Sequence, residues 1–484
     1  MNSLSRIFLA ANLLVGFVAC GGDDDPMDMT ADPCSPVITA ECTLTSYETT
    51  SFNFEDGDGN LTAYDNIVVT DRGEGTGTVT WTANNTYELN GLVFVNAGQT
   101  LTIEPGTVIR GQAGQGERAS VLVVARGGRI EANGSATNPI IFTSVSDNTV
   151  STPSGILTAE NLNENANGLW GGVVLLGNAT TNTDPAQQAI EGIPTSEERG
   201  AFGGSDDDDN SGTFRYVSIR HGGTDIRAGN EINGLTMGGV GRGTTIEYVE
   251  VFANKDDGFE WFGGTVNTRY LVSAFNKDDA MDYDMGWRGL NQFWLVYQDE
   301  GGDWGGEHDG GTSPETGTPF AIPLIANATY RGGGENDLLR IRDNAGGKYF
   351  NSIFHNFGNG VEIEFLSSGQ DSYQQFLDGN LEIENNVFWN IDDSVILDLS
   401  GDVDDAPSDA LGNLSAYFGN AGNTSTMDPM FSAGIIPGNT QLGPTTDLDD
   451  SFFQDANYRG AVEPGTSLDN AWTAGWTRFT SVVQ

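Results

Sequence analysis

Positive charge is scarce in this chain. Lys and Arg total 21 against 68 Asp and Glu, which gives a formal net charge of -47. Such an excess repels nucleic acid phosphates and anionic lipid surfaces, so we expect no nucleic acid partner and no direct binding to a lipid surface. The same carboxylates offer many oxygen ligands to hard cations, and calcium is the expected cofactor. Solubility alone explains the charge equally well.

Long apolar runs are also missing. No later stretch of 18 apolar residues occurs, so no transmembrane helix is expected. The run Ile7–Val18 follows Arg6 and is too short to span a bilayer, which is typical of a signal peptide over residues 1–19. It ends in Phe17-Val18-Ala19-Cys20, which resembles the lipobox of bacterial lipoproteins and implies lipidation of Cys20. An ordinary signal peptide with an incidental cysteine is the alternative.

Residues 20–50 are rich in Asp, Pro and Thr, and they predict a flexible acidic tether. The run Gly21–Asp25 resembles the signals that send lipoproteins of Bacteroidota-type bacteria to the exterior of the outer membrane. The expected location is therefore the outer membrane, lipid-anchored and facing the cell exterior, with the lipid as the only membrane contact. In an exported, oxidising context, Cys34 and Cys42 are expected to form a disulfide.

Helix-period apolar stretches are absent as well, whereas Gly reaches 66 residues. Short runs rich in Val, Ile, Phe and Thr alternate with Gly, Asn and Asp turns, as in Leu92–Val95, Leu101–Ile103 and Val121–Val124. The turns are too brief for hairpins but fit stacked coils. We predict an all-β chain: a right-handed, single-stranded parallel β-helix over residues 51–400. Polar insertions, among them 183–212, predict projecting loops, and residues 401–484 an irregular, aromatic-rich cap.

A 22-residue repeat sharpens this prediction. Asn254–Gly258 recurs as Asn276–Ala280, and the same offset relates Tyr248 to Tyr270 and Glu260 to Asp282. A further step of 22 residues places Glu300 beneath Asp278. Strands of neighbouring coils lie about 4.8 Å apart, so equivalent residues form columns at that spacing.

The body of the chain resembles a group of β-helical surface proteins of Bacteroidota-type bacteria. The matching stretches are Leu101–Gly106, Asn138–Thr143, Asp257–Gly264, Asp279–Gly289 and Asn457–Trp476. The resemblance implies a pectin-lyase-like β-helix and an extracellular site, and it carries no established reaction.

The repeat stacks carboxylates into a ladder. Carboxylates at such spacing repel one another, so each takes up a proton, finds a cation or points into water. Calcium accepts six to eight oxygens in flexible geometry. The predicted metal ligands are Asp257, Glu260, Asp282, Asp284 and Glu300. The competing interpretation is that alternate residues of the ladder simply face solvent.

A catalytic interpretation rests on a second resemblance. Asn254-Lys255-Asp256, Asp278-Asp279, Glu307-His308-Asp309 and Arg340-Ile341-Arg342 are similar in order to the motifs of polygalacturonase-type glycoside hydrolases. The resemblance implies that Asp256 and Asp279 activate water, that Asp278 is the general acid, and that His308 and Arg340 orient the sugar. In this chain Lys255 replaces a Thr, and His308 lacks its flanking glycines.

Aromatic residues crowd the same region. Exposed rings stack on sugars, and Trp261, Trp287 and Trp304 are the candidates for glycan stacking, unless they pack inside the solenoid. The leading hypothesis is a calcium-stabilised surface lipoprotein that binds an extracellular polysaccharide or another surface component. The alternatives are a polysaccharide-degrading hydrolase or lyase, and a non-catalytic adhesin or partner of an outer-membrane protein in an assembly.

Overall fold

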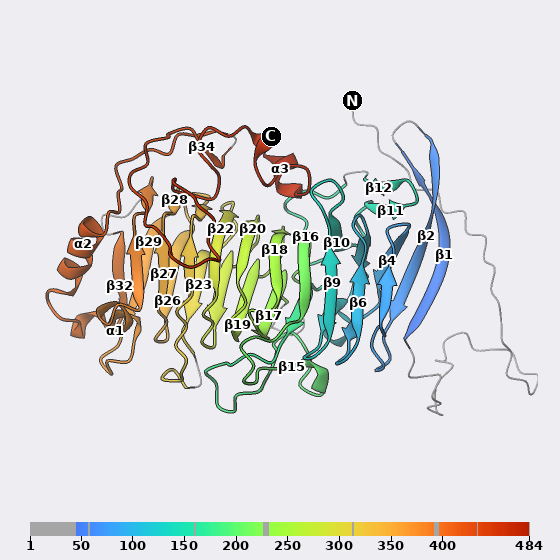
Figure 1. Cartoon of the computed structure of the whole chain (residues 1–484), viewed down its shortest axis with the longest axis horizontal. Helices are drawn as coiled ribbons and strands as arrows, with labels where there is room; N and C mark the ends of the chain where they lie inside the picture. The colour runs from blue at the N-terminus through green and yellow to red at the C-terminus, as the bar shows by residue number, and fades with distance from the viewer. Residues whose placement is uncertain are drawn as a thin grey trace, which may run out of the picture.

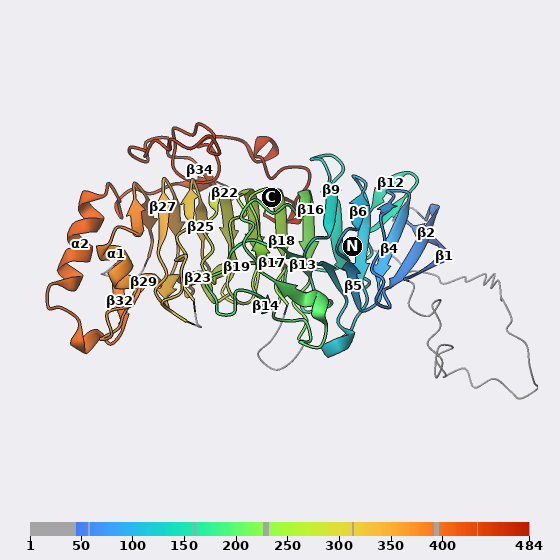
Figure 2. The same cartoon turned by 60° about the horizontal axis from the view of Figure 1, so that its bottom comes forward.

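The computed structural model describes residues 45–56, 59–158, 161–225, 232–311, 314–391, 396–432 and 434–483. The leader, most of the tether, and Cys20, Cys34 and Cys42 lie outside these residues, so the signal peptide, lipidation and disulfide remain predictions. The described chain is an elongated parallel β-helix whose coils stack along the long axis (Figures 1 and 2). The predicted fold class is confirmed. Among the described residues, no helix is long and apolar enough to cross a membrane.

One face of the solenoid is a ten-stranded parallel sheet, here called the ten-stranded face. In spatial order its strands are β5 (Leu92–Val95), β8 (Val121–Val124), β13 (Val173–Leu176), β17 (Leu235–Val240), β19 (Phe259–Gly264), β21 (Met281–Asp284), β23 (Trp304–Asp309), β26 (Asp337–Arg342), β29 (Asn359–Phe365) and β32 (Leu397–Gly401). Each strand between the two ends pairs in parallel with the coil before and the coil after, as the short strands and brief turns predict.

An eighteen-stranded sheet forms the other two faces. Its strands are β1 (Ser46–Glu55), β2 (Leu61–Thr70), β3 (Val79–Trp81), β4 (Asn85–Leu89), β6 (Thr100–Ile103), β7 (Val108–Gly111), β9 (Arg129–Asn133), β10 (Ile140–Ser144), β16 (Gly212–Arg220), β18 (Thr245–Phe252), β20 (Thr268–Ala274), β22 (Leu290–Tyr297), β24 (Leu324–Ala326), β25 (Thr329–Arg331), β27 (Gly347–Phe350), β28 (Ile353–His355), β30 (Leu381–Glu384) and β31 (Val387–Trp389). β16 pairs with β9 through its first half and with β10 through its second, so the sheet turns a corner within the strand.

The corner residues explain part of the repeat. Tyr216, Tyr248 and Tyr270 have φ of 50°, 55° and 59°, a left-handed conformation that is uncommon for bulky side chains. Their rings stack outside the sheet with centroids 4.3 Å apart at each step. Later coils place Asn327 and Asn351 at the same kind of corner, where Asn tolerates positive φ well. The predicted pairing of Tyr248 with Tyr270 is confirmed.

Both ends of the solenoid are covered. At the first coils β1 and β2 form an antiparallel hairpin, and because β1 begins at Ser46 the tether ends a few residues before the predicted boundary at residue 50. At the last coil α2 (Ala410–Asn420) buries Leu414 and packs Tyr417 and Phe418 against the core. Helix α1 (Ser372–Leu377) lies in the loop before β30.

The aromatic C-terminal segment does not cap the last coil, contrary to our prediction. It runs back along the side of the solenoid (red in Figure 1) and ends in α3 (Arg478–Val482). There Trp476 packs edge-on against Tyr216, and Trp472 against Tyr270, which covers the outer tyrosine column. The aromatic segment therefore covers the side of the solenoid, whereas α2 and the residues after it, which pair with β31 through Thr424, cover the end.

Candidate cation-binding groove

Carboxylates gather in a depression of about 390 Å³ on the outer surface of the ten-stranded face. We call it the acidic groove. Its lining residues are Glu191, Asn233, Asp256, Asp257, Glu260, Asp278, Asp279, Asp282, Asp303 and Glu307. None of these described lining residues is Lys, Arg or His, although Glu307 pairs outward with Arg340 and Arg342 at 3.3 and 2.9 Å.

Strand alternation builds the centre of the groove. On β19, Phe259 and Trp261 point into the core, so Glu260 between them points outward. On β21, Met281 and Tyr283 point inward in the same way, and Asp282 points outward. Glu260 and Asp282 are direct partners in the parallel pairing of the two strands. This confirms the predicted 22-residue offset for the pair.

The turns that precede these strands supply further carboxylates. Asp256 and Asp257 precede β19, while Asp278 and Asp279 precede β21 one coil later. Three sets have ligand oxygens that all lie within 4.8 Å of one another: Asp256, Asp257 and Asp278; Asp257, Glu260 and Asp282; and Asp278, Asp279 and Asp303. Since Asp257 and Asp278 each belong to two sets, the sets form one continuous chain of oxygens.

Burial and mutual repulsion disfavour charge on this ladder. Burial raises the pKa of Asp257 well above its usual value, and the neighbouring Asp256 and Asp279 raise it further. Burial likewise raises the pKa of Glu260, with Glu191 as the next cause. The pKa of Asp282 is raised by burial and then by Asp309. A cation within the groove would reverse this repulsion.

Hydrogen bonds within the protein satisfy only part of the groove. Asp257 accepts the N–H of Asp279 at 2.9 Å, and Asp279 accepts the N–H of Trp304 at 2.7 Å. By contrast, Oδ1 of Asp282 and Oδ1 of Asn233 are buried and have no hydrogen-bond partner among the described residues. Asn233 is only 1% exposed, and its Nδ2 donates to Glu260.

A buried amide oxygen without a donor is costly, whereas carboxylate and amide oxygens together are the ligand set that calcium prefers. The residues present therefore fit a calcium ion. Asn233 was not predicted as a site residue, because it lies 24 residues before Asp257 and the repeat was recognised only at an offset of 22.

The predicted position of Glu300, one coil after Asp278 on the ladder, is wrong. Glu300 does not lie beneath Asp278; it lines a separate depression with Lys277, Tyr297 and Asp299. Asp303 takes its place in the groove, and its N–H donates to the carbonyl of Asp278 at 3.2 Å. The coil gains residues around Gly301 and Gly302, so the offset of Tyr283 from His308 is 25 rather than 22.

Asp284 also lies outside the acidic groove as defined by its lining residues. It is the outward partner of Phe262 and accepts the N–H of Met285. Of the five predicted metal ligands, the structure therefore brings Asp257, Glu260 and Asp282 together, and it separates Asp284 and Glu300 from them.

The predicted hydrolase residues do not converge. Asp256, Asp278 and Asp279 line the acidic groove, but His308 is fully buried inside the solenoid. Its ring stacks on Tyr283 at 4.0 Å and its Nε2 lies 2.5 Å from the hydroxyl of Tyr349. Burial lowers the pKa of His308 to about 3. It cannot reach a sugar, and the role implied for it by the hydrolase resemblance is wrong.

Arg340 is on the outer surface, where it pairs with Glu307 and Glu362. It also covers the ring of Trp304 at 4.4 Å, and both residues line a second depression of about 300 Å³. The predicted glycan-stacking role is wrong for Trp261 and Trp287, which are 0% exposed and stack on each other in the core with centroids 4.4 Å apart. Trp304 is the only one of the three at a surface depression.

These features define a class: a parallel β-helix with an acidic groove on one face. The sequence matches the pectate-lyase-like β-helix domain over residues 73–477, and the chain belongs to that family. No curated protein matches the chain, and no solved structure does.

Proposed function

We propose that the acidic groove binds calcium and that the bound ion recruits acidic groups of an extracellular polysaccharide. The observation that carries the proposal is the pair of buried oxygens without donors, on Asn233 and Asp282, in a groove that is otherwise lined by carboxylates. Calcium suits the site better than magnesium, since it tolerates more oxygens in less regular geometry.

The family match supports a polysaccharide as the partner, because this fold is named for pectate lyases. A glycan carboxylate would complete the coordination of an ion that the groove itself holds. Beside the groove, Arg340 and Trp304 offer a guanidinium stacked on an indole ring to a chain that continues across β23 and β26. With Cys20 as its predicted lipid anchor, the protein would present this face outside the outer membrane. A non-catalytic adhesin or an assembly with an outer-membrane protein would use the same face.

A polysaccharide-degrading enzyme is the second candidate. Burial raises the pKa of Asp278, which lets this carboxyl hold a proton as a general acid. Against hydrolysis, an oxygen of Asp278 lies within 4.8 Å of one of Asp256 and of one of Asp279, closer than the roughly 5–5.5 Å or 6.5–9.5 Å that retaining and inverting pairs use. The groove is therefore better suited to holding a cation than to placing water between two carboxyls.

A polysaccharide panel tests the proposal. The wild type and Asp282→Asn would be assayed against polyuronates, sulfated glycans and neutral glycans, with calcium and with a chelator. We expect the wild type to bind polyuronates only with calcium and the variant to bind at least tenfold more weakly, because the loss of even a supporting partner of a metal site costs about tenfold or more. Equal binding in chelator would contradict the proposal. Release of shorter chains would establish the enzyme instead.

A further inference from the structure

An inserted segment reaches the acidic groove from outside the coils. It joins β13 to β16 and contains β14 (Gln188–Ala189), a 3₁₀ turn, η3 (Glu198–Gly200), and β15 (Ala201–Phe202). In Figure 1 it lies below the strands of the ten-stranded face, near β17 and β19. The prediction of a projecting loop is thus only partly right, since the segment folds back on the sheet. It carries Glu191, whereas the other nine lining residues of the groove belong to the coils.

Apolar packing holds the segment against the sheet. Ile190, Ile193 and Phe202 are buried in one cluster with Phe262, Val174 and other outward residues of the ten-stranded face. Phe202 and Phe262 have ring centroids 6.2 Å apart. Because Glu191 directly follows Ile190, the docking of this cluster sets where the carboxylate lies. Glu191 is the first charge, after burial, that raises the pKa of Glu260.

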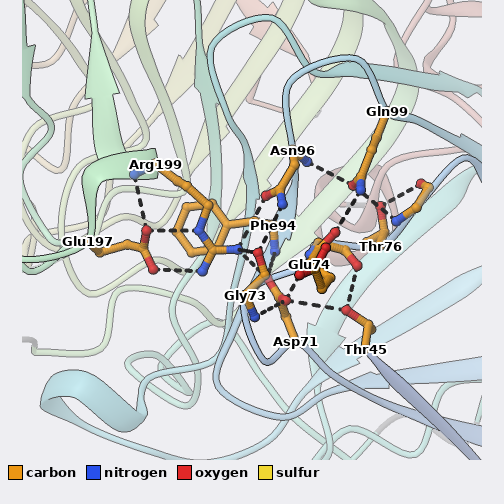
Figure 3. A network of polar contacts seen from close by, with 12 residues as sticks. Thr45, Asp71, Gly73, Glu74, Thr76, Phe94, Asn96, Gln99, Glu197 and Arg199 are labelled. Atoms are coloured by element: carbon orange, nitrogen blue, oxygen red, sulfur yellow. Dashed lines mark hydrogen bonds and ion pairs between the residues drawn. The ribbon is translucent and has the colours of Figure 1, made fainter. Parts of the chain in front are cut away.

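Arg199 fastens the same segment to the first coils (Figure 3). Its Nη1 lies 2.7 Å from Oδ2 of Asp71, whose side chain is 0% exposed. Its guanidinium also lies 3.9 Å from the ring centroid of Phe94. Within the segment, its Nε and Nη2 donate to the two carboxylate oxygens of Glu197 at 2.8 and 2.6 Å. The bidentate pair fixes the guanidinium plane.

The acceptor at Asp71 is itself rigidly held. Its Oδ1 accepts N–H groups of Gly73 and Gly75 at 2.8 and 3.0 Å, and its Oδ2 accepts that of Phe94 at 3.2 Å. Figure 3 shows these bonds converging beside Arg199. At the other end of the segment, Asp207 pairs with Arg288 at 2.7 Å. Both anchors follow Glu191 in the chain, so they fasten the part of the segment that leads from Glu191 back to the coils.

We infer that Glu191 is a cation ligand supplied from outside the solenoid, and that Arg199 is the positioning residue that keeps it in the acidic groove. This inference rests on the proposed calcium site. It gives the inserted segment a function: it adds a carboxylate to those of Asp257 and Asp282, which the coils place beside Glu260.

The test is calcium titration by calorimetry on the full chain, with Glu191→Gln, Arg199→Met, Arg199→Lys and the double variant Glu191→Gln/Arg199→Met. Glu198→Gln is the matched control, since it removes an exposed charge from the same segment without lining the groove. Amide hydrogen exchange of residues 186–193 is measured in chelator for each.

We expect Glu191→Gln and Arg199→Met each to weaken calcium binding about tenfold, the loss typical of removing a supporting partner of a metal site. The double variant should be no weaker than either single variant, because both remove the same ligand. Arg199→Lys should recover part of the calcium affinity. Among the single variants, Arg199→Met alone should speed amide hydrogen exchange at residues 186–193. Glu198→Gln should match the wild type in both measurements.

Two results overturn the inference by itself: a wild type that binds calcium while Glu191→Gln binds it equally well, or additive losses in the double variant. A wild type that binds no calcium overturns the proposed function and this inference together, so the two failures are distinguishable.

Discussion

Glu260 and Asp282 are direct partners on neighbouring strands β19 and β21, and both carboxylates face outward into the acidic groove. Adjacent carboxylates in such a pair repel unless a proton or a cation lies between them. Burial raises the pKa of both. Without a cation, this part of the face opposes folding at neutral pH.

The first prediction concerns pH. An acid whose pKa is raised by folding stabilises the folded state below its ordinary pKa, and this contribution is lost as the pH rises through the raised value. Asp282→Asn cannot lose a proton, so its stability lacks that decline. In chelator we expect the variant to become increasingly more stable than the wild type as the pH rises above about 4.

Thermal unfolding across that range measures the difference. The three histidines contribute equally to both proteins, so they cancel. A stability difference that is constant with pH, or that favours the wild type at high pH, would show that folding does not raise the pKa of Asp282.

The second prediction tests which of two carboxylates, Asp303 or Glu300, contributes to the acidic groove from the coil after Asp278. Asp303→Asn should weaken calcium binding about tenfold, because Asp303 lines the acidic groove with Asp278 and Asp279. Glu300→Gln removes the same charge a few residues away, in a different depression, and should leave the affinity within about twofold. Calorimetric titration of calcium into both variants tests this prediction. If Glu300→Gln weakened binding more than Asp303→Asn, Glu300 would be the ligand, as the 22-residue offset predicts.

The third prediction concerns His308. Replacing this buried ring with Ala leaves a cavity between Tyr283 and Tyr349, and it should lower the free energy of unfolding by about 2–4 kcal/mol. Calcium affinity should be unchanged. Because folding lowers the pKa of His308 to about 3, the wild-type histidine costs stability as the pH falls below its ordinary value of 6.5.

Denaturant unfolding and calcium titration of His308→Ala measure the two effects separately. A folded variant of wild-type stability that loses calcium or glycan binding would return His308 to the functional site.

The fourth prediction concerns the C-terminal segment. Glu250 is fully buried on β18, and its carboxylate accepts the N–H groups of Arg478 and Phe479 at 2.9 and 2.7 Å. Glu250→Gln keeps the shape and loses the charge-assisted bonds, which should cost about 1.5–3 kcal/mol. Hydrogen exchange should quicken over residues 471–483 and stay unchanged in β19 and β21. Uniform change across the chain would mean that the segment is not fastened at Glu250.

The 22-residue repeat correctly predicted the residue pairs that lie on coils of equal length. Glu260 with Asp282 and Tyr248 with Tyr270 lie as the offset requires, because the two coils have the same number of residues between corners. Glu300 was misplaced since the next coil is longer, and a change of length shifts every later residue. Asn233 was missed because its coil is two residues longer, and Glu191 because it lies in the inserted segment.

Strand parity limited the remaining site predictions. A one-residue shift along a strand turns a side chain from the solvent to the core, and the motif around His308 does not state which residue begins the inward series. Trp261 alternates with Glu260 and so had to point inward once Glu260 pointed out. Motif order along the chain carried no information on which face each residue occupies.

The central claim is that the acidic groove holds a calcium-like cation. The most direct measurement is anomalous diffraction from crystals of the chain grown in chelator and then soaked with terbium. We predict a peak within roughly 2.3–2.6 Å of carboxylate oxygens of Asp257, Glu260 or Asp282. A peak elsewhere on the surface, with the acidic groove empty at full soak, would contradict it.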